Sequence, residues 1–170
     1  MQIETTRFGT ITVEDKAIYH FPEGLPGFDG DMHFAFFPHR APDGSASPIR
    51  WMQCMEQGAL AFPVINPWHV RPDYAPTIPG PVLKMLGITD IHKQMRLYSI
   101  MTIPAGDPSG ITINLLAPVV VNKIDRIGRQ VLVQNESYPL RAPLTLPSTL
   151  PPPEDKASGG RRRRSTSAAL

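Results

Sequence analysis

The stretch that decides the fold spans residues 96–122 and reads RLYSIMTIPAGDPSGITINLLAPVVVN. Within it, every second residue from Ile111 to Leu115 is apolar, so the apolar side chains share one face of a strand. The preceding residues 104–110 include two prolines and two glycines, which favour a connection over a helix or a strand. The stretch therefore predicts a strand on each side of this loop and a third strand over residues 119–122.

Segments of the same kind continue along the chain, separated by turn residues such as glycine and proline. About ten short strands at spacings near ten residues predict a mainly β fold with a small antiparallel, barrel-like sheet. The 20 prolines among 170 residues argue against long helices, because proline breaks helix interiors. The expected strands cover residues 2–7, 10–13, 17–21, 33–37, 49–55, 60–65, 96–103, 111–115, 119–122 and 129–134, with Gly128 in the turn before the last of them.

Residues 67–95 are the exception to the strand pattern, because five prolines interrupt the first part of this segment. We expect an extended loop there, followed by a short helix that begins at Pro81 and ends at Gly87. A second helical turn is expected over residues 90–94. One or two short helices would then cap one end of the barrel.

The chain is expected to divide into a β domain over residues 1–146 and a disordered tail, rich in proline and arginine, over residues 147–170. Order is expected to fade from Pro139 onward. The first 150 residues carry 12 basic and 13 acidic side chains, while the last 20 carry five and two. A near-neutral body argues against nucleic-acid binding by the folded domain. The run Arg161–Arg164 leaves open a weak, salt-sensitive contact of the tail with RNA, or a solvated tail without a partner.

Composition also argues against several kinds of site. The single cysteine, Cys54, excludes an internal disulfide framework and a zinc site built on cysteine. The five histidines show no metal-ligand spacing, so we expect neither a metal nor a cofactor. The first residues do not resemble a secretory signal, and the longest apolar runs are about seven residues. We therefore expect a cytoplasmic protein that does not contact the membrane.

A catalytic site would need a nucleophile beside a base, and the pair that the sequence offers is Cys54 with His69. Cys54 lies inside an apolar strand, however, and free cysteines in such positions usually serve packing. We therefore expect no catalytic residues and no enzymatic activity.

Residues 21–28 read FPEGLPGF, and their glycines suggest a phosphate-binding loop at first sight. No Lys-Ser or Lys-Thr pair follows, and no clear helix begins there. Pro26 followed by Gly27 fits a type II turn instead, since proline fixes the first central φ and glycine accepts a positive φ at the second. We expect Gly24, Pro26, Gly27 and Phe28 to form a structural turn held to the core, with contact to a partner as the alternative.

The residues expected to bind a partner are Glu56, Phe62, Trp68 and Tyr74, which lie on or beside the proline-rich segment. Trp68 and Tyr74 stand on a loop, where a large ring is harder to bury, and aromatic residues are enriched in protein interfaces. The alternative is that these rings pack into the core or anchor the loop.

A series of short motifs stands out along the chain. They are TRFG (6–9), FPEGLPGF (21–28), WMQ (51–53), LAFPV (60–64), PDY (72–74), INLLAPVVVN (113–122), GRQV (128–131) and YPLRAPL (138–144). Taken in this order, they resemble the flagellar assembly factor FliW family over about residues 1–144. The turn motif and the NLLAP segment are the most specific of them.

The resemblance implies a small barrel-like β fold, no enzymatic activity, and two protein partners, flagellin and the RNA-binding regulator CsrA. It implies that the protein binds CsrA and antagonises CsrA repression of flagellin translation, while newly made flagellin competes for the same factor. Two alternatives stay open: a chaperone dedicated to flagellin without a link to CsrA, and an RNA binder that acts through the arginine tail.

Overall fold

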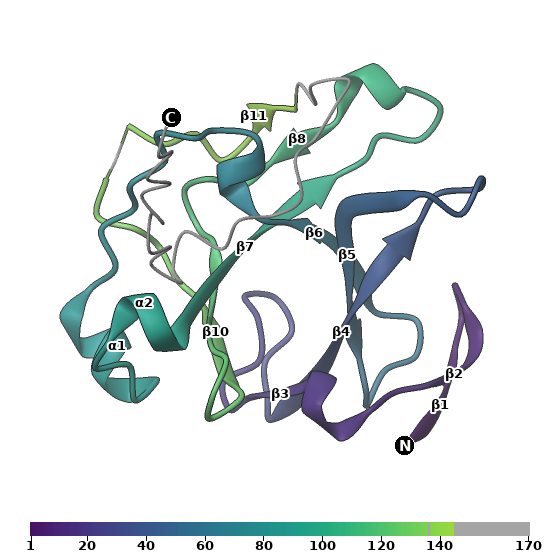
Figure 1. Cartoon of the computed structure of the whole chain (residues 1–170), viewed down its shortest axis with the longest axis horizontal. Helices are drawn as coiled ribbons and strands as arrows, with labels where there is room; N and C mark the ends of the chain where they lie inside the picture. The colour runs from purple at the N-terminus through teal and green to yellow at the C-terminus, as the bar shows by residue number, and fades with distance from the viewer. Residues whose placement is uncertain (136, 145–170) are drawn as a thin grey trace, which may run out of the picture.

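Seven strands close into a barrel in the computed structural model, which describes residues 1–135 and 137–144 (Figure 1). The barrel strands are β3 (Ile18–Phe21), β4 (Met32–Arg40), β5 (Ala46–Cys54), β6 (Ala61–Ile65), β7 (Met95–Thr102), β9 (Val119–Asn122) and β10 (Ile127–Gln130). Around the barrel they follow the order β7–β6–β5–β4–β3–β10–β9, and β9 pairs with β7 to close it. Neighbouring barrel strands are antiparallel except β10 and β3, which pair in parallel.

The other strands lie outside the barrel. β8 (Thr112–Ile113) pairs with β7, and β11 (Ala142–Pro143) pairs with β8, so the sheet extends beyond the barrel at this side. β1 (Gln2–Thr5) and β2 (Gly9–Thr12) form a separate hairpin. The strand pattern read from the sequence therefore folds into one closed barrel with two small additions.

The helical segments are short, in keeping with the frequency of proline. α1 (Gly80–Met85) and α2 (Ile91–Gln94) follow the proline-rich loop, close to the positions expected for them. Single 3₁₀ turns occupy Asp15–Ala17, Pro67–His69 and Pro108–Gly110. No helix within the described part of the chain has both the length and the hydropathy needed to cross a membrane. The prediction of a mainly β, barrel-like fold with one or two short helices is confirmed.

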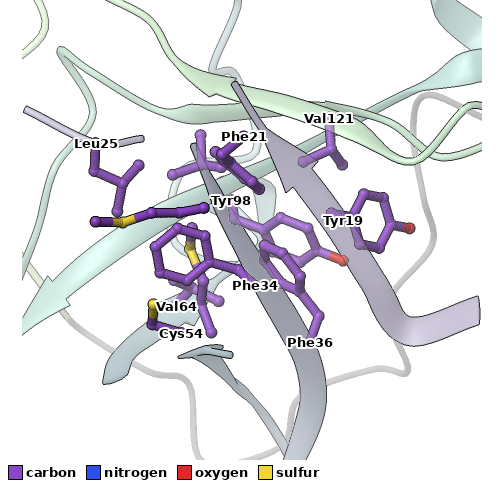
Figure 2. Packing of buried hydrophobic residues seen from close by; sticks show 12 residues of the cluster. Tyr19, Phe21, Leu25, Phe34, Phe36, Cys54, Val64, Tyr98 and Val121 are labelled. Atoms are coloured by element: carbon purple, nitrogen blue, oxygen red, sulfur yellow. The ribbon is translucent and has the colours of Figure 1, made fainter. Parts of the chain in front are cut away.

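The core has one part inside the barrel and one part outside it. Because side chains alternate along a strand, β7 contributes to both, with Tyr98 facing inward and Leu97 facing outward. On the outside, Leu86 and Ile88 from the helical segment pack against the barrel. The interior cluster is rich in aromatic rings, as Figure 2 shows, and includes Tyr19, Phe21, Phe34, Phe36 and Tyr98.

Gly128 lies inside β10 and not in the turn before it, which corrects the expectation from the sequence. The turn covers residues 123–126, and the Asn122 side-chain oxygen accepts hydrogen bonds from two of its backbone N–H groups. A Cβ atom on residue 128 would lie 2.5 Å from the Phe21 ring. Glycine therefore stands at this position because an aromatic ring packs directly on the strand, and β10 ends at Gln130.

The expectation that order fades from Pro139 is wrong for residues 139–144. The Leu115 N–H donates to the Pro139 carbonyl at 3.1 Å, and the Leu144 N–H donates to the Ile111 carbonyl at 3.0 Å. β11 thereby adds a strand to β8, although its proline content argues locally against regular structure. The expected tail, residues 147–170, lies outside the described residues.

Candidate functional site

The connection between β3 and β4 folds back into one end of the barrel, and Figure 1 shows it inside the ring of strands. At its tip the Phe28 N–H donates to the Leu25 carbonyl at 2.7 Å, and the Leu25 N–H donates to the Phe28 carbonyl at 3.0 Å. Gly27, at the second central position after Pro26, has a φ of 85°. Gly24 has a φ of 65°, and a Cβ atom there would lie 2.1 Å from the Phe28 carbonyl oxygen. These glycines allow the turn that buries Leu25 in the barrel core.

Aromatic rings cover this end of the barrel, which we call the closed end and define by residues 24–28 and Phe62. The Phe28 ring meets the Phe62 ring edge to face at 5.7 Å between centroids, and Phe62 lies 6.5 Å from Phe34 in the interior. Phe28 is 37% exposed, whereas Phe34 is fully buried. Edge-to-face contacts of this kind stabilise aromatic clusters beyond the burial of area. At the closed end, the partly exposed Phe28 ring therefore packs on Phe62, which in turn contacts the buried Phe34.

Glu56 lies at the same end, in the turn that follows β5. Its carboxylate accepts hydrogen bonds from the His33 backbone N–H at 2.9 Å and from the His33 Nδ1 at 2.8 Å. Burial raises the pKa of the Glu56 carboxyl, but these hydrogen bonds outweigh burial and hold the pKa below its usual value. Glu56 is therefore ionised at neutral pH and fixed in orientation at the surface.

Other ionisable side chains contact one another beside Glu56 or follow β3 in the chain. The His33 ring stacks on His20 at 4.9 Å, and Asp31 contacts the His20 Nε2 at 2.5 Å. Glu23 forms an ion pair with Arg129 at 3.0 Å. Despite this mixture of histidines and carboxylates, no group of three or more His, Cys, Asp or Glu within the described ranges is arranged to hold a metal ion. Asp31 and Glu56 thus hold the stacked His20 and His33 from either side, while Asp29 follows Phe28 in the sequence.

Trp68 and Tyr74 lie away from the closed end, on the outer layer of the barrel. Tyr74 is 3% exposed, and its hydroxyl donates to the Leu115 carbonyl at 2.6 Å. Burial raises the pKa of the Tyr74 phenol far above its usual value. The Trp68 Nε1 donates to the Tyr74 carbonyl at 2.7 Å. Both rings therefore anchor the proline-rich loop, and Tyr74 offers almost no surface to a partner.

The structure thus separates the four residues that the sequence suggests for partner binding. Phe62 contacts Phe28 at the closed end, and Glu56 lies in the turn after β5 there, whereas Trp68 and Tyr74 belong to the outer layer. Sequence reasoning misses Asp29 and Asp31 as members of this surface. The signal that could have found them is the presence of three carboxylates between residues 23 and 31, on both sides of the turn.

The opposite end of the barrel, which we call the open end, contains a cavity lined in part by Arg50, His69 and Arg96. Cys54 lies towards the closed end of β5, where its Sγ donates to the Glu56 carboxylate at 3.4 Å. The structure therefore does not bring Cys54 and His69 together. Burial raises the pKa of the Cys54 thiol, which disfavours the thiolate that a nucleophile requires.

Sequence similarity connects this barrel to a known family. The family model described as FliW protein matches residues 2–144. The chain belongs to the FliW family. A flagellar assembly factor FliW from Thermotoga neapolitana is 35% identical over 140 residues, which cover 82% of this chain and 90% of the relative. Another, from Leptospira interrogans, is 37% identical over 141 residues, which cover 83% of this chain and 91% of the relative.

A solved structure of a FliW protein shares the fold. The crystal structure of the flagellar assembly factor FliW matches with a TM-score of 0.73 and 31% sequence identity, and the match covers 85% of this chain and 97% of that chain. The family and the barrel-like β fold predicted from the sequence are both confirmed. The chain is thus a member of a family of flagellar assembly factors.

Proposed function

We propose that the protein binds flagellin and the RNA-binding regulator CsrA, and that by binding CsrA it relieves CsrA repression of flagellin translation. The observation that carries this proposal is the match to the FliW family over residues 2–144. The protein would act by covering surfaces of other macromolecules, and we expect it to catalyse no reaction.

We assign CsrA to the closed end, which combines the partly exposed Phe28 ring with the carboxylates of Glu56 and Asp31. An RNA-binding protein carries positive charge, and a complementary acidic surface accelerates encounter and fixes orientation. Glu56 supports this assignment because His33 holds its carboxylate ionised and in place. Phe28 supplies an apolar anchor, since its ring is partly exposed and rests on Phe62.

Flagellin would regulate this interaction by competing for the protein. While unexported flagellin occupies it, CsrA stays on the flagellin messenger RNA and translation is repressed. Export of flagellin then frees the protein to remove CsrA. The scheme requires only that the fraction of the protein bound to flagellin sets the fraction that is free to bind CsrA.

Calorimetric titration of the full-length protein with purified CsrA, and separately with flagellin, tests the proposal. We expect saturable binding of both partners, and we expect Glu56→Gln to weaken CsrA binding about tenfold or more. Glu14→Gln is the matched control, because it removes an exposed carboxylate whose partner is Lys16 at the surface. It should leave CsrA affinity within about twofold of wild type.

These titrations, together with a third one against RNA, separate the alternatives. Absence of binding to both partners contradicts the proposal. Binding of flagellin without CsrA would instead indicate a chaperone dedicated to flagellin. Direct binding of RNA that weakens with salt and disappears when Arg161–Arg164 are replaced by serine would indicate an RNA binder.

A further inference from the structure

A groove of about 510 Å³ lies between the N-terminal hairpin and β4, and the proposed function does not use it. It exists because β3 and β4 differ in length. β3 pairs with β4 only as far as Ala35, whereas β4 continues to Arg40. Before Ile18 the chain turns away through the 3₁₀ turn, so no strand of the described ranges pairs with the last part of β4 on this side. The apolar lining comes from Ile11, Val13, Ala17, Phe36, Phe37 and Pro38.

The edge of β4 that borders this groove is poorly suited to pair with a further β-strand. Pro38 has no N–H to donate, and proline is typical of strand edges that stay unpaired. The Phe36 carbonyl already accepts a hydrogen bond from the Arg50 Nη2 at 3.3 Å. The register between β4 and β5 also shifts between Pro38 and Arg40. An occupant of the groove must therefore bind mainly through its side chains.

The chain itself carries a segment with the required properties. Residues 150–155 read LPPPED and lie beyond Leu144, where the described part of the chain ends. Consecutive prolines favour the polyproline II conformation, which needs no ladder of backbone hydrogen bonds. Grooves lined by aromatic and apolar side chains recognise segments of this kind. Phe37 and the neighbouring apolar residues of the groove offer such a surface.

The charges of the groove and of this segment are complementary. Glu14 and Lys16 form an ion pair at 2.6 Å, so their charges offset each other. Arg40 is exposed at the end of β4 and supplies the remaining charge of the described lining, which is positive. Glu154 and Asp155 follow directly after the prolines and supply negative charge. Opposite charges of this kind fix the orientation of a bound segment.

The length of the chain beyond Leu144 allows the contact. β11, β8, β7, β6, β5 and β4 are successive neighbours in the sheet, so β4 lies five strand spacings from β11. At roughly 4.8 Å for each spacing, the path along the curved sheet is about 24 Å. The pairings that lead from Ala142 around the sheet end opposite Phe37, so the displacement along the strands is small. The ten residues from Leu144 to Glu154 span about 31 Å as polyproline II, which is enough.

We propose that residues 151–155 of this chain bind in the groove between the N-terminal hairpin and β4. The prolines pack on the apolar lining, and the carboxylates of Glu154 and Asp155 lie beside Arg40. The contact also holds the run Arg161–Arg164, which begins six residues after Asp155, near the N-terminal hairpin. It does not depend on which partner binds at the closed end.

A nitroxide spin label attached at Ser158→Cys of the isotope-labelled full-length protein tests this contact. Cys54 is fully buried, so the label reacts with the tail alone. We expect the label to broaden the backbone amide signals of residues 11–13 and 36–40 more than those of any other part of residues 1–144, and reduction of the nitroxide to restore them. Strongest broadening elsewhere in the domain, or no broadening at all, would overturn the proposal.

Variants of the two charged groups test the assigned orientation. Arg40→Gln, and separately Glu154→Gln together with Asp155→Asn, should each lower the relaxation enhancement at residues 36–40 by about twofold to fivefold, as expected for an exposed ion pair. Lys84→Gln is the matched control, because it removes an exposed cation that does not line the groove. Equal enhancement in Arg40→Gln and Lys84→Gln would contradict the assigned orientation.

A mixing experiment distinguishes the chain's own tail from that of a second copy. Spin-labelled protein without isotopes is mixed with isotope-labelled protein that carries no spin label. We expect the signals of residues 11–13 and 36–40 to remain unchanged in the mixture. Broadening of these signals would show that the groove binds the tail of another copy, and would contradict the contact within one chain.

Discussion

The two ends of the barrel are built from the same strands and differ in chemistry. At the closed end the inward-facing side chains include Cys54 and Phe62, and the Phe28 ring contacts Phe62. At the open end, inward positions of β5 and β7 hold Arg50 and Arg96 around a cavity. Alternation determines which side chains face the interior. The inward-facing residues nearest each end of the strands then determine whether that end is filled by aromatic rings or lined by charged groups.

The surfaces at the two ends also have opposite charge. The closed end carries the carboxylates of Glu56 and Asp31, whereas Arg50 and Arg96 line the cavity of the open end. A basic partner should therefore recognise the closed end. Because the ends lie at opposite ends of the strands and share no ion pair among the described residues, substitutions at them should have additive effects.

The largest effect is expected from Gly24→Ala, which breaks the closed end. The new Cβ atom would lie 2.1 Å from the Phe28 carbonyl oxygen, and the backbone φ of 65° is unfavourable for alanine. We expect a loss of about 3 kcal/mol or more in the free energy of unfolding, measured with urea. Gly27→Ala is the control, because its φ is also positive but the space around it is open. It should cost about 1 kcal/mol, and equal costs for the two variants would show that the tight turn does not depend on Gly24.

A smaller effect on the free energy of unfolding is expected when one residue from each end, Phe62 or Arg50, is replaced. Phe62→Ala removes a partly buried ring that supports Phe28, and we expect it to cost about 2–3 kcal/mol of unfolding free energy. Arg50→Met removes a charge without an ion-pair partner in the described part of the chain, so it should stay within about 1 kcal/mol of wild type or increase stability. Urea unfolding of both variants measures the contrast. If Arg50→Met costs as much as Phe62→Ala, Arg50 has a structural role at the open end.

The smallest effects are expected in the pH dependence of stability, where each end has its own window. The pKa of His69 is lowered by burial from its usual 6.5, so the unfolded chain binds the proton more readily and stability falls as the pH drops below about 6.5. The pKa of Glu56 lies below its usual 4.5, so its contribution is present above that pH and is lost as the pH falls further. Thermal unfolding as a function of pH should therefore flatten in the upper window for His69→Gln and in the lower window for Glu56→Gln. The environments described for the two residues would be contradicted if His69→Gln changed the pH dependence only below pH 4.5 and Glu56→Gln changed it only near pH 6.5.

Much of the fold can be predicted from the sequence because its signals are local. Alternation between Ile111 and Leu115, and turn residues between segments, indicate strands without knowledge of their neighbours. Gly128 and β11 are not predictable in this way. Glycine is required at 128 because the Phe21 ring packs on it, and β11 exists because Ala142 pairs with Ile113. Both causes are contacts between distant parts of the chain.

The candidate sites show the same limit. Glu56 and Phe62 could be singled out from their place beside the strand connection, but Tyr74 is buried because its hydroxyl meets the Leu115 carbonyl, a contact that composition does not reveal. Arg50 and Arg96 line one cavity only because the barrel closes. A polar residue at an inward position of an apolar strand is the signal that could have drawn attention to them.

A gel-shift measurement of the complex between CsrA and flagellin messenger RNA tests the proposed function most directly. We expect free RNA to appear as the full-length protein approaches the concentration of CsrA, and added flagellin to restore the complex. A CsrA–RNA complex that persists unchanged in a large excess of the protein would contradict the account.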